Sequence, residues 1–193
     1  MAMSKAKRFF TSTILGVGLL AGCSNANNYA MSEPREFKQW LAPQPFSELF
    51  IQAAQERLGY TETTHRADLR QFMGVDPRRT EWCAAYLNAV LYSLGHTGST
   101  NTAHPLLAQS FLEVGTPVTR ERVTIGDIVV FSRGSEVWQG HVGIFMGETL
   151  DSRGRTQWLI LGGNQDNSVG IHPYSPRRVL GVRRLEGQYY ASI

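Results

Sequence analysis

The chain has 193 residues, which fits one compact domain and argues against two large ones. With 42% hydrophobic and 18% charged residues, its composition is that of a globular protein and excludes collagen-like, coiled-coil and disordered chains. The net charge of +3 comes entirely from Lys5, Lys7 and Arg8. The rest of the chain is balanced in charge, so we expect no nucleic-acid partner.

The first 22 residues have the features of a signal peptide. Basic residues are followed by an apolar stretch from Ile14 to Leu20, which is too short to span a bilayer. The segment ends in Leu20-Ala21-Gly22-Cys23, which resembles the lipobox of bacterial lipoprotein precursors. That resemblance implies cleavage before Cys23 and attachment of lipid to its sulfur. The alternative is an ordinary cleaved signal peptide with an incidental cysteine.

The residue after the lipidated cysteine helps to sort lipoproteins of Gram-negative bacteria. Here it is Ser24 and not an aspartate, so the resemblance implies the outer membrane, facing the periplasm. Residues 23–45 have no clear period and contain three prolines, which predicts a lipidated cysteine and a tether. Residues 46–193 are predicted to form a single domain, and we expect a monomer held at the membrane by this anchor.

The periodicity of apolar residues predicts helices first and strands second. Ser47 lies near the start of the first helix, Thr80 can cap the third, and Gly59, Gly95 and Gly115 follow helices. The predicted helices span residues 46–58, 66–73, 81–94 and 105–113. The predicted strands span residues 127–132, 141–146, 157–161, 168–172 and 179–184. Because no crossover helices separate the strands, we expect an α+β domain with an antiparallel sheet.

Cys83 is left without an intramolecular partner if Cys23 carries lipid. Cysteines in an oxidising compartment are usually paired, so an unpaired thiol there calls for an explanation such as catalysis, intermolecular pairing or simple burial. With Thr80 as the cap, Cys83 lies in the first turn of a helix, where free N–H groups favour the thiolate. The alternative is that Cys83 is a small apolar residue that is simply buried and has no chemical role.

His141 begins a predicted strand and is flanked by Gly140 and Gly143, which leave room for a substrate or for a second backbone. Near the end of the next strand, the amide of Asn164 can fix the tautomer of a catalytic histidine. The alternative for Gly162-Gly163-Asn164 is a β-turn. Gln165 and Asp166 are substitutes for the orienting role.

Four segments in the same order resemble those of the CHAP-type and NlpC-type enzymes, which are papain-like peptidoglycan hydrolases. The segments are Trp82-Cys83-Ala84-Ala85-Tyr86, Gly126-Asp127-Ile128-Val129-Val130-Phe131, Trp138-Gln139-Gly140-His141-Val142-Gly143 and Leu161-Gly162-Gly163-Asn164-Gln165. The resemblance covers residues 79–185. It implies a papain-like fold, with N-terminal helices packed on a C-terminal antiparallel sheet, and it implies Cys83 as nucleophile, His141 as base and Asn164 as the orienting residue. One departure is that many CHAP relatives carry a glutamate shortly before that asparagine, where this chain has Gly162 and Gly163.

The resemblance implies a lipid-anchored cysteine hydrolase that cuts amide bonds in peptidoglycan peptides, as an endopeptidase or an amidase. Trp82, Trp138 and Tyr86 are candidates for contact with sugar or peptide, and core packing is the alternative for each. We expect no cofactor and no metal, because the chain has no histidine pair at ligand spacing and no cysteine cluster. Two other hypotheses stay open: a papain-like acyltransferase, and a non-catalytic envelope binding lipoprotein in which Cys83 is merely buried.

Overall fold

The computed structural model describes residues 44–189, which form three α-helices, eight β-strands and three short 3₁₀ helices. The predicted signal peptide, Cys23 and the tether up to residue 43 lie outside the described residues. The helices are α2 (Phe46–Gln55), α3 (Arg66–Met73), α4 (Cys83–Ser93) and the 3₁₀ helices η1 (Ala108–Glu113), η2 (Arg120–Arg122) and η3 (Pro176–Arg178). The strands are β1 (Gln44–Pro45), β2 (Thr116–Val118), β3 (Ile128–Ser132), β4 (Gly140–Leu150), β5 (Thr156–Gln165), β6 (Ser168–Tyr174), β7 (Val179–Arg184) and β8 (Gln188–Tyr189).

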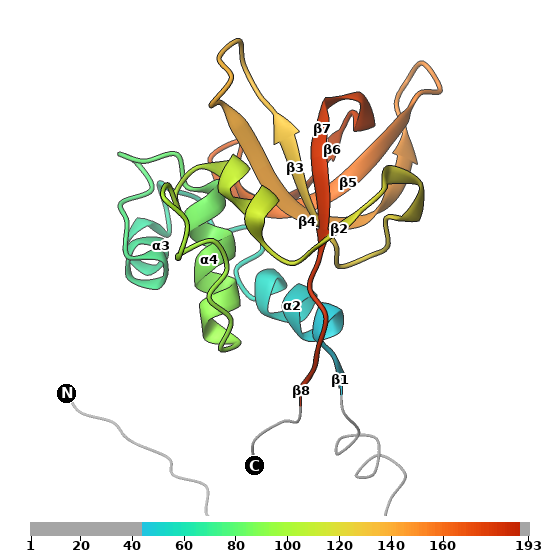
Figure 1. The fold of residues 1–193 in the computed structure, drawn as a ribbon. Helices are drawn as coiled ribbons and strands as arrows, with labels where there is room; N and C mark the ends of the chain where they lie inside the picture. Colours follow the sequence, from blue (N-terminus) through green and yellow to red (C-terminus); the bar gives the residue numbers. More distant parts are fainter. Residues whose placement is uncertain (1–43, 190–193) are drawn as a thin grey trace, which may run out of the picture.

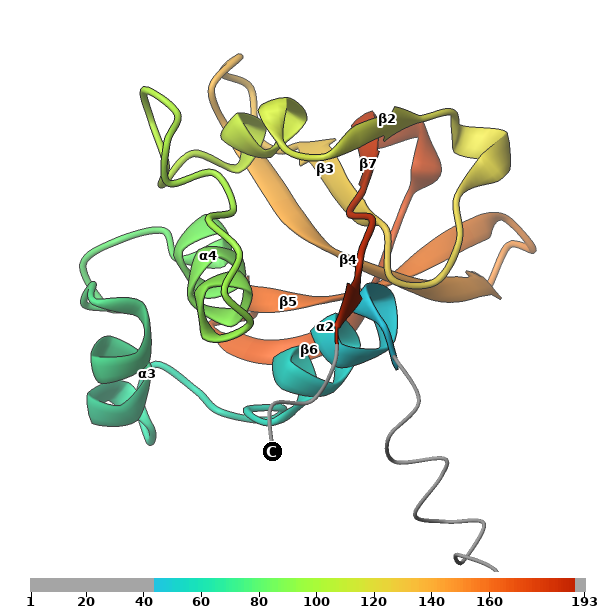
Figure 2. The ribbon, with the colours of Figure 1, turned by 60° about the horizontal axis from the view of Figure 1, so that its bottom comes forward.

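Six of the strands form one antiparallel sheet in the order β2-β7-β3-β4-β5-β6. The helices lie together beside the sheet, as Figure 1 shows, and Figure 2 shows β5 and β6 passing next to α4. The expected α+β class with an antiparallel sheet is confirmed. β1 pairs with β8, so the two ends of the described chain lie side by side. Residues 44–45 therefore belong to the domain and not to the tether.

The central strands are buried on both faces, which explains their nearly continuous apolar sequences. Val130 and Val142 pack with the helices in the larger hydrophobic cluster, whereas Val129, Phe131 and Phe145 belong to a smaller cluster. Successive side chains of a strand point to opposite faces, so each face of β3 contributes to a different cluster. The sheet therefore lies between the two hydrophobic clusters, and each of its faces packs against one of them.

Most predicted elements are present, with local differences. The predicted bounds of α3 and β7 agree with the structure, whereas α2 ends at Gln55 and not at Leu58. The predicted fourth helix is instead the 3₁₀ helix η1. Strand β2 was not predicted, because it is only three residues long and contains Pro117; a proline is tolerated there since β2 is an edge strand.

Gly163 lets α4 pack directly against β5. A Cβ atom at this position would lie 2.6 Å from Cζ3 of Trp82 and 2.7 Å from Cβ of Tyr86, both distances being far too short. Residues 162–164 belong to β5, and the turn comes later, where Asp166 and Asn167 have positive φ angles. Gly163 therefore serves helix–sheet packing and Gly162 lies close to the backbone of β4, and the pair does not form the β-turn that was the alternative interpretation.

Asp127 forms a buried ion pair that joins the start of β3 to the end of β7. Its carboxylate accepts bonds from Nε and Nη2 of Arg184 at 2.8 and 2.7 Å and from the backbone N–H of Thr124 at 2.8 Å. The Asp127 side chain is 3% exposed and that of Arg184 is 32% exposed, so loss of the carboxylate charge leaves a partly buried guanidinium without its counterion.

We expect Asp127→Asn to lower the free energy of unfolding by about 2–3 kcal/mol, within the range for breaking a partly buried pair. Urea denaturation measures this change. The matched control is Glu56→Gln, which breaks the more exposed pair with Arg57 and should cost less than about 1 kcal/mol. Equal losses in the two variants would contradict the structural role of Asp127.

Among residues 44–189, no helix is both long enough and apolar enough to cross a membrane.

Candidate active site

Cys83 is the first residue of α4, and Trp82 occupies the N-cap position without a side-chain cap. The helix was predicted to begin earlier, at residue 81, with Thr80 as its cap. The cysteine is 4% exposed and lines a pocket of about 350 Å³ that is open to solvent. It is the one free cysteine among the described residues. The thiol is therefore buried but reaches a cavity.

The thiol lies against strand β4, next to the residue that follows His141. The backbone N–H groups of Val142 and Ala84 are close enough to the sulfur to lower the pKa of Cys83. Val142 is the neighbour of His141 in β4, so packing of α4 on the sheet brings the sulfur to the start of the predicted histidine strand.

Burial raises the pKa of the Cys83 thiol above its ordinary value. The N–H groups of Val142 and Ala84 and the positive charge of Arg133 oppose this effect, and the carboxylate of Glu81 adds to it. The N–H of Ala84 at the start of the helix favours the thiolate, as expected, but removal of the sulfur from water has the larger effect and raises the pKa of Cys83. The free protein holds a neutral thiol.

His141 is 1% exposed, and burial lowers its pKa to about 3. The charges of Arg133 and His172 act in the same direction, whereas the carboxamide of Gln165 raises the pKa. The imidazole is therefore neutral at neutral pH. Within residues 44–189, neither ring nitrogen has a hydrogen-bond partner.

Tyr174, at the end of β6, was not predicted as part of the site. Its ring stacks on the ring of His141, with the centroids 4.8 Å apart and the planes 7° from parallel. Burial raises the pKa of Tyr174 to about 12, the positive charge of Arg133 lowers it, and ionisation of the Cys83 thiol would raise it further. Arg133 also acts on Cys83 and on His141, so all three side chains lie within electrostatic reach of this one guanidinium. No pattern in the sequence singled out this tyrosine.

Gln165 is oriented so that its carboxamide oxygen is left for His141. Its Nε2 atom donates to the carbonyl oxygens of Ile160, Gly162 and Gly170 at 3.1, 3.1 and 2.6 Å. Carbonyl groups only accept, so the nitrogen must face them and the oxygen must point away. That oxygen is buried and has no partner within the described residues. It is the acceptor that a neighbouring imidazole N–H requires.

The side chain of Asn164 turns away from the histidine. Its Nδ2 atom donates to Oε2 of Glu81 at 2.6 Å, and its backbone has a φ angle of 57°. Asp166, the other substitute for the orienting role, is 90% exposed and pairs with His172 at 3.3 Å. Of the three candidates, only the Gln165 carboxamide acts on His141.

The aromatic residues predicted to contact substrate divide into two groups. Trp138 is 57% exposed and lines the pocket beside Cys83. Trp82 and Tyr86 are fully buried, and their polar atoms bond Glu62 and the backbone of Ala54. These two belong to the core and do not face the pocket, because the packing of α4 on Gly163 encloses them.

No known protein-family model matches this chain, and no curated protein matches it either. Function is therefore inferred from the cluster itself. Across the part of the chain that the structure describes, no three His, Cys, Asp or Glu side chains are placed to hold a metal ion.

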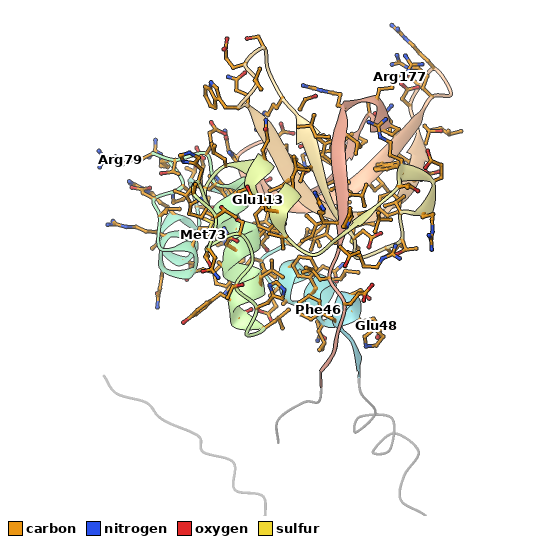
Figure 3. The ribbon with its side chains drawn as sticks, viewed as in Figure 1. Phe46, Glu48, Met73, Arg79, Glu113 and Arg177 are labelled. Carbon is orange, nitrogen blue, oxygen red and sulfur yellow. The ribbon has the colours of Figure 1, made fainter. Side chains whose placement is uncertain are left out.

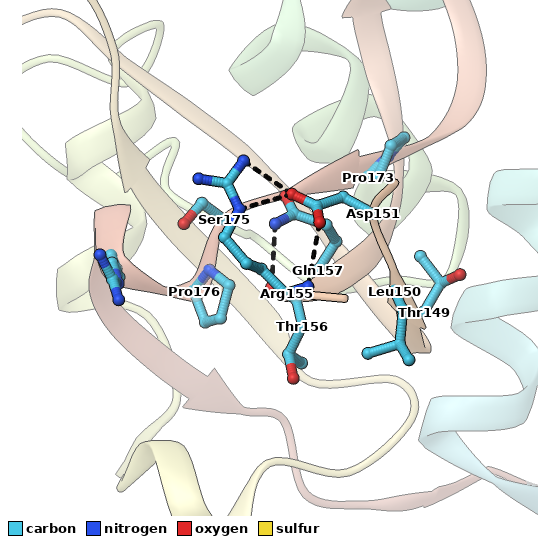
Figure 4. A pocket seen from close by; sticks show the side chains of 10 residues that line it. Thr149, Leu150, Asp151, Arg155, Thr156, Gln157, Pro173, Ser175 and Pro176 are labelled. Atoms are coloured by element: carbon cyan, nitrogen blue, oxygen red, sulfur yellow. Dashed lines mark hydrogen bonds and ion pairs between the residues drawn. The ribbon is translucent and has the colours of Figure 1, made fainter. Parts of the chain in front are cut away.

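A larger pocket, of about 740 Å³, lies at the other end of β4 from His141. Figure 4 shows Asp151 and Arg155 paired at its wall, with Pro173 and Pro176 nearby. Arg177, also at this pocket, projects from the end of the sheet away from α3 (Figure 3). Its lining contains neither a cysteine nor a histidine, so we assign no catalytic chemistry to it.

Proposed function

We propose that this protein is a lipid-anchored cysteine hydrolase with a papain-like arrangement, which cleaves amide bonds in the peptides of peptidoglycan. The proposal rests on one observation. The Cys83 thiol, at the start of α4 and on a pocket that is open to solvent, lies against the segment of β4 that contains the neutral His141. A thiol on an open cavity and a neutral imidazole in the adjoining strand are the two groups that acyl transfer to cysteine uses.

His141 acts as the base in the proposed reaction. The thiol is neutral in the free protein, so its proton passes to the imidazole as the sulfur attacks the carbonyl carbon. The imidazolium then gives that proton to the leaving amine, and a thioester remains on Cys83. Water attacks the thioester with His141 again as base, releasing the acid and restoring the thiol.

The backbone at the start of α4 supplies stabilisation for the oxyanion. The first N–H groups of a helix have no partner within the helix, and in this proposal those at the start of α4 hold the oxygen on which negative charge develops. The N–H of Val142 approaches the same sulfur from β4. Both elements are held by the core, so little reorganisation is needed when the charge forms.

In this proposal Gln165 takes the orienting role that the resemblance assigned to Asn164. In the free protein the two groups are not hydrogen-bonded; during the reaction the Gln165 oxygen would accept the N–H of His141 and leave the other ring nitrogen as the base. We expect Gln165→Leu to reduce kcat about 10²-fold, within the range for loss of a positioned acid–base group. Asn164→Ala, the matched control, removes the contact to Glu81 and places alanine at a positive φ angle, and it should still lower kcat less than about tenfold.

Folded protein is quantified in each variant, because Gln165 also bonds three carbonyl groups. A larger loss of kcat in Asn164→Ala than in Gln165→Leu would return the orienting role to Asn164.

The envelope location and the substrate class come from the sequence. The lipobox-like Leu20-Ala21-Gly22-Cys23 supports an anchor in the outer membrane on its periplasmic side, where peptidoglycan is within reach. Mass spectrometry of fragments released from purified sacculi tests the activity and identifies the bond that is cut. Release of no fragments would overturn the proposal, and transfer of the acyl group to an added amine instead of water would indicate an acyltransferase.

A further inference from the structure

The larger pocket, at the other end of β4 from His141, lies where two connections of the sheet meet. One is the turn between β4 and β5, which contains Asp151 and Arg155, and the other is η3, which contains Arg177. η3 contacts β5, so the two connections are neighbours in space although β6 separates them along the chain. The volume of about 740 Å³ is within the range of small-molecule sites.

The carboxylate of Asp151 is fully used by its own turn. Its Oδ1 atom accepts the backbone N–H groups of Arg153 and Arg155, both at 2.9 Å. Its Oδ2 atom lies 2.7 Å from both Nε and Nη2 of Arg155, and Figure 4 shows the guanidinium held against the carboxylate. Two oxygens with four donors have no lone pair left for a ligand. The one acidic group in the described lining therefore serves to orient a cation.

Arg177 supplies a second guanidinium, which has no partner in residues 44–189. The Arg155 side chain is 61% exposed and its Nη1 atom is also unbonded among these residues, and Arg177 is exposed as well. Two guanidinium groups and one carboxylate leave the lining with a net charge of +1. Arg153 and Arg178, which are exposed neighbours in the chain, add to the positive potential. The pocket therefore favours an anion.

The number of free donors favours a phosphate over a carboxylate. One guanidinium fork binds both oxygens of a carboxylate. A phosphate monoester has three terminal oxygens, so it can bind the fork of Arg177 and still accept a bond from Nη1 of Arg155. The hydroxyl groups of Thr149, Thr156 and Ser175 also line the pocket and can donate further bonds.

The pocket is larger than a phosphate group alone requires. Leu150, Pro173 and Pro176 give part of its lining an apolar surface, and Leu150 is 67% exposed. The carboxamide of Gln157 adds a polar group beside them. Such a mixed lining suits a ligand that joins a phosphate to a carbon skeleton.

We propose that this pocket binds a phosphate monoester, whose phosphate bridges Arg177 and Arg155 and whose carbon skeleton lies on Leu150 and the two prolines. A soluble ester and a lipid headgroup share this phosphate chemistry. The pocket has no lining residue in common with the one beside Cys83, so the inference does not depend on the proposed function.

Isothermal titration calorimetry of the purified full chain in neutral detergent micelles tests this inference. The probes are glycerol 3-phosphate, phosphatidic acid and glycerate, which carries a carboxylate on a similar skeleton, all at the same ionic strength. At least one of the phosphate esters should bind saturably, and glycerate should bind at least about tenfold more weakly than it, because it forms fewer hydrogen bonds to the charged groups. Tighter binding of phosphatidic acid than of glycerol 3-phosphate would identify a lipid ligand, and the reverse order or equal affinity a soluble one.

Three variants locate the binding. Arg177→Gln should weaken it at least about tenfold, as expected for loss of hydrogen bonds to a charged group, and should leave the unfolding temperature unchanged because the side chain has no partner in the described residues. Arg155→Gln should weaken it as well. The matched control is Arg178→Gln, which removes the same charge at an exposed position outside the lining and should bind as the parent does.

Three results would overturn the inference. They are no saturable binding of either phosphate ester, equal affinity for glycerate, and equal losses in Arg177→Gln and Arg178→Gln. The third result would mean that the summed positive charge of this end of the sheet attracts anions without a defined site.

Discussion

Replacement of Cys83 by alanine should reduce the release of peptidoglycan fragments by at least about 10³-fold, because no other group takes over attack on the carbonyl. The described residues contain no second free cysteine, and His141 alone lacks a nucleophile to activate. The measurement is the initial rate of fragment release from purified sacculi, followed by mass spectrometry.

The control for this experiment is Ser93→Ala, an exposed position at the opposite end of α4. It should leave the rate unchanged, and both variants should unfold near the temperature of the parent. Cys83→Ala introduces only a small change of volume at a site that already adjoins a pocket. Folded Cys83→Ala protein with the parental rate would contradict the proposed mechanism.

The buried, neutral His141 should make the protein less stable as the pH falls from about 6.5. Burial holds its pKa at about 3 in the folded protein, whereas an unfolded histidine titrates near 6.5. Between these values the unfolded chain binds one more proton than the folded protein. The stabilisation is complete above pH 6.5 and is lost as the pH decreases, by about 2 kcal/mol at pH 5.

Urea denaturation at several values between pH 6.5 and 5 measures this loss. Carboxylates interfere little in that range; the pKa of Asp76, for example, is lowered to about 2 by its hydrogen bond with Arg66. His141→Phe keeps a ring to stack on Tyr174 but has no titrating group, so its stability should change much less with pH. His104→Gln, at an exposed histidine, is the control and should follow the parent.

Equal pH dependence of stability in the parent and in His141→Phe would show that this imidazole is not buried in its neutral form. The groups that act on His141 are Arg133, His172 and Gln165, and Tyr174 stacks on its ring. Arg133 and His172 are positive when protonated and disfavour a second positive charge, so they add to the effect of burial.

The sequence predicted those parts of the fold that depend on neighbours along the chain. The apolar periodicity of residues 66–73 agrees with α3, and the β-branched run of residues 179–184 agrees with β7. Helices followed by strands without crossovers predicted the antiparallel sheet. The sequence also singled out Cys83 and His141, because a lone thiol at a helix start and a histidine between glycines are local patterns.

The identity of the amide that faces His141 was decided by tertiary structure. Along a regular strand, alternation predicts which side chains share a face, but β5 and β6 shift register between Gly162 and Gln165. Asn164 has a positive φ angle there, which turns its side chain to Glu81 and leaves Gln165 beside the histidine. Such a shift of register depends on how β5 and β6 pair, so the alternation of residues along one strand does not predict it.

The sequence by itself determined the order of helices and strands, the position of a thiol at the start of a helix and the candidate histidine, because these follow from contacts within a few residues. Only the tertiary structure decided that Trp82 and Tyr86 are core residues and that Cys83 holds its proton. Trp82 and Tyr86 are enclosed where α4 packs on Gly163 of β5, and Cys83 is enclosed where the start of α4 meets Val142 of β4. The removal of a side chain from water depends on the packing of the whole domain, so it cannot be predicted from a local pattern of residues.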